Sequence, residues 1–364
     1  MLMGKIMSIL NELEKIAEGS FSEFKTTYFI SAKLKEYGID DFKITNPGVF
    51  GEINANKDKT IAIRADIDAL PVNPEKTEFK HMCGHHAHIT ILLEFLKIAN
   101  KNKEKLTSNI RFIFQPAEEI GKGAEFMIKK GAIEGVNEIY GLHVEPLLKL
   151  GEIGLKKGVL LAGAKFFDIE FYGKSTHAAL PHEGIDIFCV LADFILKSQL
   201  ILSRNKDPVK SGVLSIGYVH GGDTYNIIPE KLKIKGTYRF FDFETDRLLN
   251  KKISSILESL KNFYGIEYNL KFSSSTVPLI NDNKIIEKII DKLQNSEFKI
   301  ITEINPMMGS EDFAFYLQKI PGAFIRLGIS KGENHPPLHN RNFFVPEETI
   351  SYGIKLWKKL FMED

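Results

Sequence analysis

Thr60-Ile61-Ala62-Ile63-Arg64-Ala65, followed at once by Asp66-Ile67-Asp68, is the stretch that decides the fold. Its apolar and β-branched residues predict a buried strand, and the two aspartates mark its end. Leu and Ile spacing predicts a helix over residues 89–99, and further strands are predicted at 110–114 and 138–143. Strand–helix–strand alternation indicates the α/β class, with a central mixed sheet flanked by helices.

Upstream of this stretch, residues 4–37 predict two helices, the second from Phe24 to Tyr37. Residues 1–24 interleave apolar and charged side chains, as an amphipathic helix does, whereas a signal sequence contains an unbroken apolar segment. No run of about 18 apolar residues occurs, so no membrane span is expected. Two cysteines cannot form a disulfide framework, and this favours a reducing, cytoplasmic location.

Charge excludes several classes of partner. The chain carries 48 Lys and Arg against 47 Asp and Glu, for a formal net charge of +1, and contains no long run of one sign. Neither nucleic acid nor an anionic membrane surface is therefore expected as a partner.

The predicted elements follow a different order in the middle of the chain, β-α-β-β-α-β, which is the order of a small ferredoxin-like α+β domain. Strand and helix patterns like those of the first segment resume at Asn281–Leu293. A chain of 364 residues is longer than a single hydrophobic core usually serves, so two domains are expected. We expect a discontinuous catalytic domain, residues 1–164 and 276–364, interrupted by an inserted domain, residues 165–275. The strands of the insert are predicted at 165–172, 212–219, 231–241 and 266–272, and its helices at 185–202 and 245–264.

The densest chemistry lies in His81-Met82-Cys83-Gly84-His85-His86-Ala87-His88, with four imidazoles and a thiol in eight positions. These side chains ligate borderline-soft divalent metals, whereas a core would use Leu or Val and a solvated loop Ser, Asp or Lys. A structural zinc site would need a second Cys pair, but Cys189 has no histidine beside it. The cluster therefore predicts a functional metal site.

Four further groups of polar residues carry potential chemistry. Two of them lie at the ends of predicted strands: Gln115-Pro116-Ala117-Glu118-Glu119, and Gly141-Leu142-His143-Val144. Adjacent carboxylates repel each other. A metal site offsets this cost when one carboxylate ligates the metal and the other serves as a base. The other two are His177 to His182 in the insert, and His335 to Asn340, which follows Gly309-Ser310-Glu311-Asp312-Phe313. Taken singly, each is at least as consistent with a solvated loop or an ordinary core or surface histidine as with a functional site.

Together and in this order, the motifs resemble the aminoacylase/carboxypeptidase-type metallopeptidase superfamily. Within it they are similar to the amidohydrolase branch that includes hippurate hydrolases, auxin-conjugate hydrolases and N-acetyldiaminopimelate deacetylases. The segment from Arg64 to Pro71 matches that branch too, so the resemblance covers nearly the whole chain. It implies a dinuclear-metal catalytic domain and a lid or dimerisation domain, the latter joining a homodimer or higher homo-oligomer.

The resemblance also implies roles for individual residues. Glu118 would be the general base, and His177, projecting from the lid of a partner subunit, would stabilise the oxyanion. Asn226 and Arg239 would bind the polar groups and the carboxylate of the substrate; otherwise they are a turn residue and an exposed strand residue. Two divalent ions, Zn²⁺, Mn²⁺ or Co²⁺, would be held by Cys83, His85, Glu119, His143 and His339.

The chain departs from this branch in three places. His86 stands where Asp is usual, so a carboxylate that orients a metal ligand is missing or replaced. The N-terminal region lacks the usual Leu-His-x-x-Pro-Glu and keeps only Gly19-Ser20-Phe21-Ser22-Glu23-Phe24. The segment between Pro71 and His81 is short, so one wall of the expected substrate cleft should be shorter than is usual in the branch.

Three functions remain open at this point. The leading one is a metal-dependent amidohydrolase that cleaves N-acyl, above all N-acetyl, amino acids with a metal-activated water. The second is a dipeptidase or aminopeptidase on the same scaffold. The third is a catalytically silent metal-binding protein, which a free base at Glu118 argues against.

Overall fold

The computed structural model describes residues 2–332 and 335–363, and its chain divides into two compact units. Unit 1 comprises Met1–Leu160, Leu279–Asn305 and Glu311–Asp364, and unit 2 comprises Leu161–Pro278 with the short return Pro306–Ser310. The sequence-based prediction set the insert at residues 165–275 and included no such return. Each unit has its own hydrophobic core.

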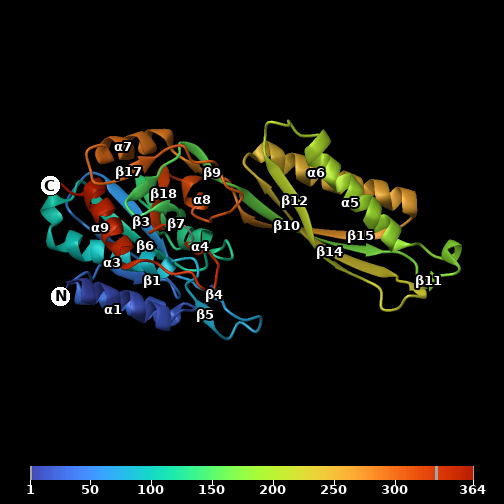
Figure 1. Ribbon diagram of the computed structural model, residues 1–364, viewed down its shortest axis with the longest axis horizontal. Coiled ribbons are helices and arrows are strands. Elements are labelled where there is room, and N and C mark those ends of the chain that lie inside the picture. The colour runs from blue at the N-terminus through green and yellow to red at the C-terminus, as the bar shows by residue number, and fades with distance from the viewer. Residues whose placement is uncertain (1, 333–334, 364) are drawn as a thin grey trace. The chain divides into compact units, whose positions relative to one another are not determined.

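Unit 1 is built on an eight-stranded mixed sheet, as predicted (Figure 1). Strand β3 lies parallel to its two neighbours, β6 and β7, and β7 lies parallel to β18. Parallel neighbours bring their carboxyl ends to one edge of the sheet, where α/β proteins bind ligands. In spatial order the strands are β1 (Phe42–Ile44), β2 (Val49–Ile53), β6 (Asn109–Gln115), β3 (Thr60–Asp66), β7 (Glu138–Lys149), β18 (Gly322–Ser330), β8 (Glu152–Gly154) and β17 (Lys299–Ile301).

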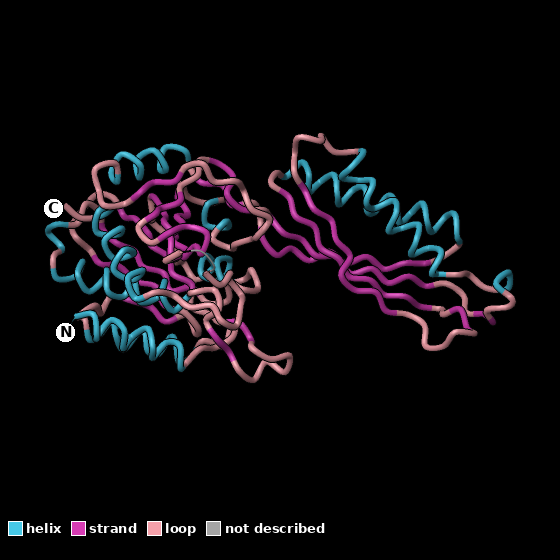
Figure 2. Tube along the Cα trace, viewed as in Figure 1, coloured by secondary structure: helices cyan, strands magenta, loops and turns pink. Residues whose placement is uncertain are grey.

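Helices flank this sheet (Figure 2), and one of them, α3 (His85–Lys101), is buried along most of its length. Every residue from His85 to Leu96 is buried, because α3 packs against β3 and against helices α1 and α9. The remaining elements of unit 1 are α1 (Leu2–Lys15), α2 (Phe24–Glu36), β4 (Leu70–Pro71), β5 (Phe79–Lys80), a 3₁₀ turn (Lys103–Lys105), α4 (Gly123–Lys129), β9 (Gly158–Leu161), β16 (Leu279–Asn281), α7 (Asn283–Leu293), α8 (Ala314–Leu317) and α9 (Glu347–Phe361).

A glycine fixes where α3 begins. Gly84 has φ +87°, and a Cβ built on it would lie 2.4 Å from Cγ2 of Val144. Only glycine adopts that backbone conformation freely while leaving room for the neighbouring strand. The tight turn places Cys83 just before the helix and His85 at its first position.

Unit 2 is a four-stranded antiparallel sheet with two helices packed side by side on one face (Figure 1). Strand β14 alternates buried and more exposed residues, as expected when one face packs on helices and the other does not. Along the chain the elements are β10 (Gly163–Tyr172), β11 (Thr176–His177), a 3₁₀ turn (Pro181–Glu183), α5 (Ile187–Arg204), β12 (Gly212–His220), β13 (Ile227–Ile228), β14 (Lys231–Phe240), α6 (Phe243–Tyr264) and β15 (Glu267–Thr276).

The spatial order of the large sheet is β12-β14-β10-β15, while β11 and β13 form a separate antiparallel pair. In the part of the chain that the structure describes, no helix is both long enough and apolar enough to cross a bilayer.

Candidate metal centre

The carboxyl ends of three parallel strands meet at the candidate site. Strand β3 ends at Asp66, β6 is followed by the loop that carries Glu118 and Glu119, and β7 contains His143. Cys83, just before α3, and His85, at the first position of that helix, lie at the same place. The fold thus gathers residues that lie 60 or more positions apart in the chain, such as Cys83 and His143.

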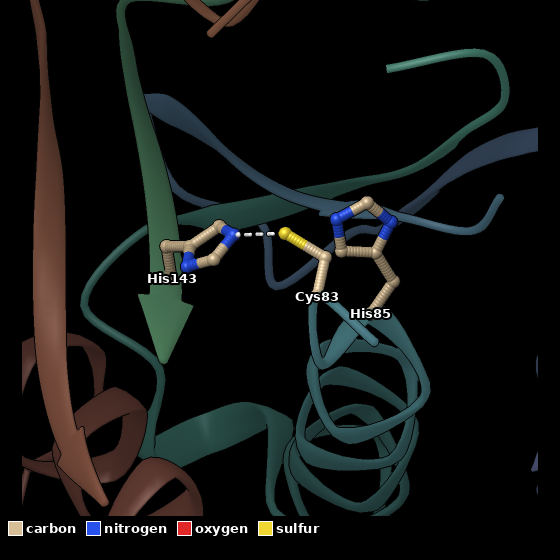
Figure 3. A group of neighbouring side chains, drawn as sticks. All are labelled: Cys83, His85 and His143. Atoms are coloured by element: carbon tan, nitrogen blue, oxygen red, sulfur yellow. Dashed lines mark hydrogen bonds between the residues drawn. The ribbon is translucent and has the colours of Figure 1, made fainter. Parts of the chain in front are cut away.

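Two groups of potential ligands share one cysteine. The ligand atoms of Cys83, His85 and His143 lie within 4.8 Å of one another, and so do those of Cys83, Glu119 and His339. Figure 3 shows the Cys83 sulfur pointing at the His143 ring, with Sγ and Nε2 separated by 3.4 Å. All five residues expected to ligate metal are therefore neighbours, and a thiolate common to both groups suits two adjacent ions.

Hydrogen bonds to backbone carbonyls set the tautomers of two of these histidines. Nδ1 of His85 lies 2.8 Å from the carbonyl oxygen of Asp68, and Nδ1 of His143 lies 2.7 Å from that of Val144. A carbonyl only accepts, so each Nδ1 carries the proton and each Nε2 keeps a lone pair. Ligating histidines are commonly oriented in this way.

The surroundings of His85 Nε2 fit a cation. Among the described residues this nitrogen has no hydrogen-bond partner; it is buried 3.5 Å from Oδ2 of Asp66 and 3.8 Å from Oε1 of Glu119, an oxygen that is likewise buried and unpartnered there. Burial raises the pKa of Glu119 to about 7, although His85 opposes this. Burial, then Glu119 and Glu118, also raises the pKa of the Cys83 thiol. Divalent ions would offset this accumulation of negative charge.

His88 helps to hold the site together through both of its nitrogens. The Val144 N–H donates to His88 Nε2 at 3.1 Å, so Nε2 accepts, and Nδ1–H donates to Oδ1 of Asp66 at 2.6 Å. Asp66, His85 and His88 also lie close enough to form a ligand triplet, but both His88 nitrogens are already engaged. His88 therefore ties the end of β3 to the backbone beside His143.

Arg64 connects Asp66 to a second set of carboxylates. Its guanidinium is fully buried and donates to Asp66 at 2.7 Å, to Glu311 at 2.9 Å and to Asp312 at 3.0 Å. Burial alone would raise the pKa of Asp66, but its electrostatic interactions with His85 and Arg64 hold it well below its usual value. One arginine thus organises carboxylates from distant parts of the chain.

Glu118 lies between the two sets of carboxylates. Its carboxylate is within 4.8 Å of His85 and Glu119 on one side and of Glu311 and Asp312 on the other. Burial, then Glu311 and Glu119, raises the pKa of Glu118 well above its usual value. Such a carboxylate readily takes up a proton, as a general base must.

His339 reaches the site from the C-terminal part of the chain. Its backbone has φ +65°, and its N–H donates to the carbonyl of Met82 at 2.8 Å, which fixes it beside the Cys83 turn. Nε2 of His339 lies 3.7 Å from Oε2 of Glu119, and its side chain is exposed. A partly open ligand leaves access for a substrate.

His86, which replaces the usual Asp, faces a different group of residues. Its ring stacks on His81 with centroids 5.1 Å apart, and its Nε2 lies 4.0 Å from Glu14. The Asp68 backbone carbonyl orients His85 instead, while the carboxylates of Asp66 and Asp68 lie 3.5 and 3.3 Å from its ring nitrogens.

The substrate-binding candidates of unit 2 occupy two separate places. His177 on β11 pairs with Ile227 on β13, and the Ala178 N–H donates to the carbonyl of Asn226 at 3.0 Å, so His177 and Asn226 are neighbours. Arg239 lies near the far end of β14, eight residues beyond Lys231 where that strand begins. At roughly 3.3 Å per residue this separation is about 26 Å.

Arg239 has an unusual environment for a cation. Its guanidinium lies over the Phe166 ring at 5.6 Å, and its Nη1 is buried with no hydrogen-bond partner among the described residues. Burial lowers the pKa of Arg239. An anionic ligand would supply the missing partner.

Sequence reasoning assigned no role to Arg64, Asp66, Asp68 or His88, although it noted their motifs. The available signal was positional: Asp66 and Asp68 follow a buried strand, and His88 lies one helical turn after His85 on the same face. Which atoms pair could not be read from spacing.

Comparisons with known proteins agree with this geometry. The model of "Peptidase family M20/M25/M40" matches residues 62–363. The N-acetyl-L-cysteine deacetylase of Bacillus subtilis (strain 168) is 37% identical over 356 residues, covering 95% of this chain and 85% of that protein. IAA-amino acid hydrolase ILR1-like 4 of Arabidopsis thaliana is 32% identical over 375 residues, covering 96% and 83%.

A solved structure is similar as well. The Bacillus subtilis YXEP protein, a dinuclear metal binding peptidase from the M20 family, matches with a TM-score of 0.84 and 29% sequence identity. The match covers 98% of this chain and 97% of that one. The resemblance stated from the motifs is therefore confirmed.

Proposed function

The chain belongs to peptidase family M20/M25/M40 and is a metal-dependent amidohydrolase; we propose that it hydrolyses N-acyl, above all N-acetyl, amino acids. The observation that carries this proposal is the pair of ligand groups sharing Cys83, with the carboxylate of Glu118 beside them. Relatives named as a deacetylase of N-acetyl-L-cysteine and a hydrolase of IAA-amino acids support this substrate class.

In this proposal the ligands are the five residues already described. Cys83, His85 and His143 would hold one ion, and Cys83, Glu119 and His339 the other. When bound, divalent ions polarise the amide carbonyl and lower the pKa of water. The thiolate, imidazole and carboxylate donors suit Zn²⁺, Mn²⁺ or Co²⁺.

Glu118 moves the proton in the proposed reaction. Its carboxylate accepts a proton from the attacking water as the new C–O bond forms. It then delivers that proton to the amide nitrogen as the C–N bond breaks, which releases a carboxylic acid and a free amine. Arg64 keeps Glu311 and Asp312 fixed next to Glu118, so the base works among immobile charges.

His177 is suited to stabilise the oxyanion. The Ala179 N–H donates to its Nδ1 at 3.0 Å, so Nδ1 accepts and Nε2 carries the proton. The exposed His177 side chain therefore offers an N–H donor, as an oxyanion requires. Asn226, which directly precedes β13, would hydrogen-bond the polar groups of the substrate.

The distance between Arg239 and the His177–Asn226 pair within unit 2 favours a homodimer or higher homo-oligomer. Arg239 would bind the substrate carboxylate, yet it lies about 26 Å along β14 from the His177–Asn226 pair. An N-acetyl amino acid cannot span that distance. One copy of unit 2 therefore cannot bring all three residues to one substrate, and we propose that His177 and Asn226 act in the site of a partner subunit.

The proposal can be tested with a substrate panel. Metal-free protein reconstituted with Mn²⁺, Co²⁺ or Zn²⁺ is assayed with N-acetyl amino acids, N-benzoyl amino acids and dipeptides. The expected result is release of acetate with free amino acid. Hydrolysis of dipeptides alone would establish the peptidase alternative, and metal binding without any turnover would establish a silent binding protein.

Glu118→Gln tests the assigned base. It should retain metal and lose turnover by roughly 10²–10⁴-fold, the usual contribution of general acid–base catalysis. Glu125→Gln is the matched control, because Glu125 lies nearby on α4 but is exposed. Near-native turnover of Glu118→Gln would contradict the role.

A further inference from the structure

We infer that Glu23, in the short 19–24 segment that the N-terminal region keeps, is a positioning residue for the Glu118–Glu119 loop. The inference rests on the proposed function, in which Glu118 is the base and Glu119 a ligand. Glu23 belongs to none of the candidate ligand groups among the described residues; its Oε1 accepts a hydrogen bond from the Ala117 N–H at 2.7 Å.

Ala117 has a backbone conformation that needs support. Its φ is +56°, in the left-handed region, which is unfavourable for a residue with a Cβ. This residue directly precedes Glu118, so its conformation sets the direction of the loop that carries both glutamates. Such strain persists only where the surroundings hold it.

The loop closes tightly after this turn. The carbonyl of Ala117 accepts from the N–H groups of Lys122 and Gly123 at 3.2 and 3.1 Å. A Cβ built on Gly123 would lie 1.6 Å from the carbonyl oxygen of Pro116, so the chain passes very close to itself. The carbonyl is thus secured within the loop, whereas the Ala117 N–H depends on Glu23, which lies 94 residues away.

A second carboxylate holds the loop on the other side of Glu118. Oδ2 of Asp68 accepts from the Glu119 N–H at 3.0 Å, and from the Ser20 hydroxyl at 2.7 Å. The backbone of the loop is therefore anchored at Ala117 and at Glu119, one residue to either side of Glu118. Ser20 and Glu23 both come from the 19–24 segment.

Packing alone does not account for a glutamate at position 23. The residue is fully buried, and its Oε2 has no hydrogen-bond partner in the described structure. Burying such a group is unfavourable, and an apolar side chain would fill the space at lower cost. The feature that an apolar residue could not supply is the acceptor for Ala117. Burial, then Asp68, raises the pKa of Glu23 to about 8, but Oε1 can accept in either protonation state.

The test compares two near-isosteric variants of the full-length protein. Glu23→Leu fills the volume without an acceptor, while Glu23→Gln keeps a carbonyl oxygen. Glu94→Leu is the matched control, since Glu94 is equally buried but binds Tyr37 rather than the loop. For each we would measure kcat and KM on an N-acetyl amino acid, the affinity of the chelator-treated protein for Co²⁺ and Zn²⁺, and unfolding in urea.

We expect Glu23→Leu to lose about 10²-fold in kcat, and 10- to 100-fold in metal affinity, with KM little changed. Glu23→Gln should stay near wild type in both, and Glu94→Leu should change stability without changing either. Adding Ala117→Gly to Glu23→Leu should restore part of both losses, because glycine adopts positive φ without strain. A merely structural role predicts no such rescue.

The inference is overturned if Glu23→Leu folds with wild-type kcat and metal affinity, or if Glu23→Gln is as impaired as Glu23→Leu. If Glu23→Leu does not fold, Glu23→Ala replaces it, and failure of both to fold would make Glu23 a core residue and also overturn the inference. Metal affinity needs no turnover. A wild type without amidohydrolase activity would therefore refute the proposed function and still leave Glu23 testable.

Discussion

Arg64→Lys is the sharpest test of how the site is held together. Arg64 donates to Gln115 through Nε at 2.9 Å, to Asp66 through Nη1, and to Glu311 and Asp312 through Nη2. Lysine keeps the charge, but its single nitrogen cannot reproduce the planar fork. If two of the bonds to carboxylates are lost, at roughly 1.5–3 kcal/mol each, the free energy of unfolding should fall by about 3–6 kcal/mol.

This loss would be a large part of the whole stability, which is about 5–15 kcal/mol for an ordinary domain. Solvent does not screen these bonds, because the Arg64, Asp66 and Asp312 side chains are all fully buried. The matched control is Arg111→Lys on β6, whose partner Glu52 lies at 2.9 Å in a partly exposed pair. Solvent reaches this pair and weakens it, so the control should lose less stability than Arg64→Lys.

The assay is urea unfolding followed by tryptophan fluorescence. The chain has a single tryptophan, Trp357, which is 2% exposed on α9 and therefore reports on unit 1. A chelator is added throughout, so that loss of metal binding does not contribute to the difference. Equal midpoints for Arg64→Lys and Arg111→Lys would refute the reasoning.

The effect should also depend on pH. Arg64 helps hold the folded-state pKa of Asp66 below its unfolded value of about 3.9. A lowered folded pKa contributes stability above the unfolded pKa, and this contribution disappears as pH falls through the folded pKa. The deficit of Arg64→Lys should therefore be fully present near neutrality and should shrink only below about pH 3.9, as the pH falls toward the folded pKa of Asp66. A deficit that grows with acidification would contradict the role of Asp66.

Three further predictions follow from the site. Cys83→Ser should lower metal content by elemental analysis for both ions, because both ligand groups include Cys83; unchanged stoichiometry would remove it as a ligand. Inactive His177→Ala mixed with inactive Glu118→Gln should regain activity through mixed oligomers, whereas no recovery after verified subunit exchange would show that each chain uses its own His177. His86→Asp should leave metal content unchanged, because His86 stacks on His81 instead of facing Cys83, and a clear change in stoichiometry would place it at the site.

Local patterns in the sequence were sufficient for much of the fold. The spacing of apolar residues and the residue types predicted β3, the helix now seen as α3, and the strands β6 and β7. These elements could be predicted because each forms from residues that are adjacent in the chain. The ligand types were equally visible, since few other pressures place a thiol among four histidines. Strand β18 was not singled out, although all nine of its residues are buried, because Arg326 and two glycines interrupt its apolar pattern.

The sequence by itself determined which side chains could ligate a metal, accept protons or build strands. These properties belong to single residues or to short repeating patterns of neighbouring residues. What only the tertiary structure decided was which atoms meet. The carbonyls that set the tautomers of His85 and His143, and the long β14 between Asn226 and Arg239, depend on register and on backbone direction. Hydrogen bonding and strand pairing join residues far apart in the chain, so no local pattern specifies them.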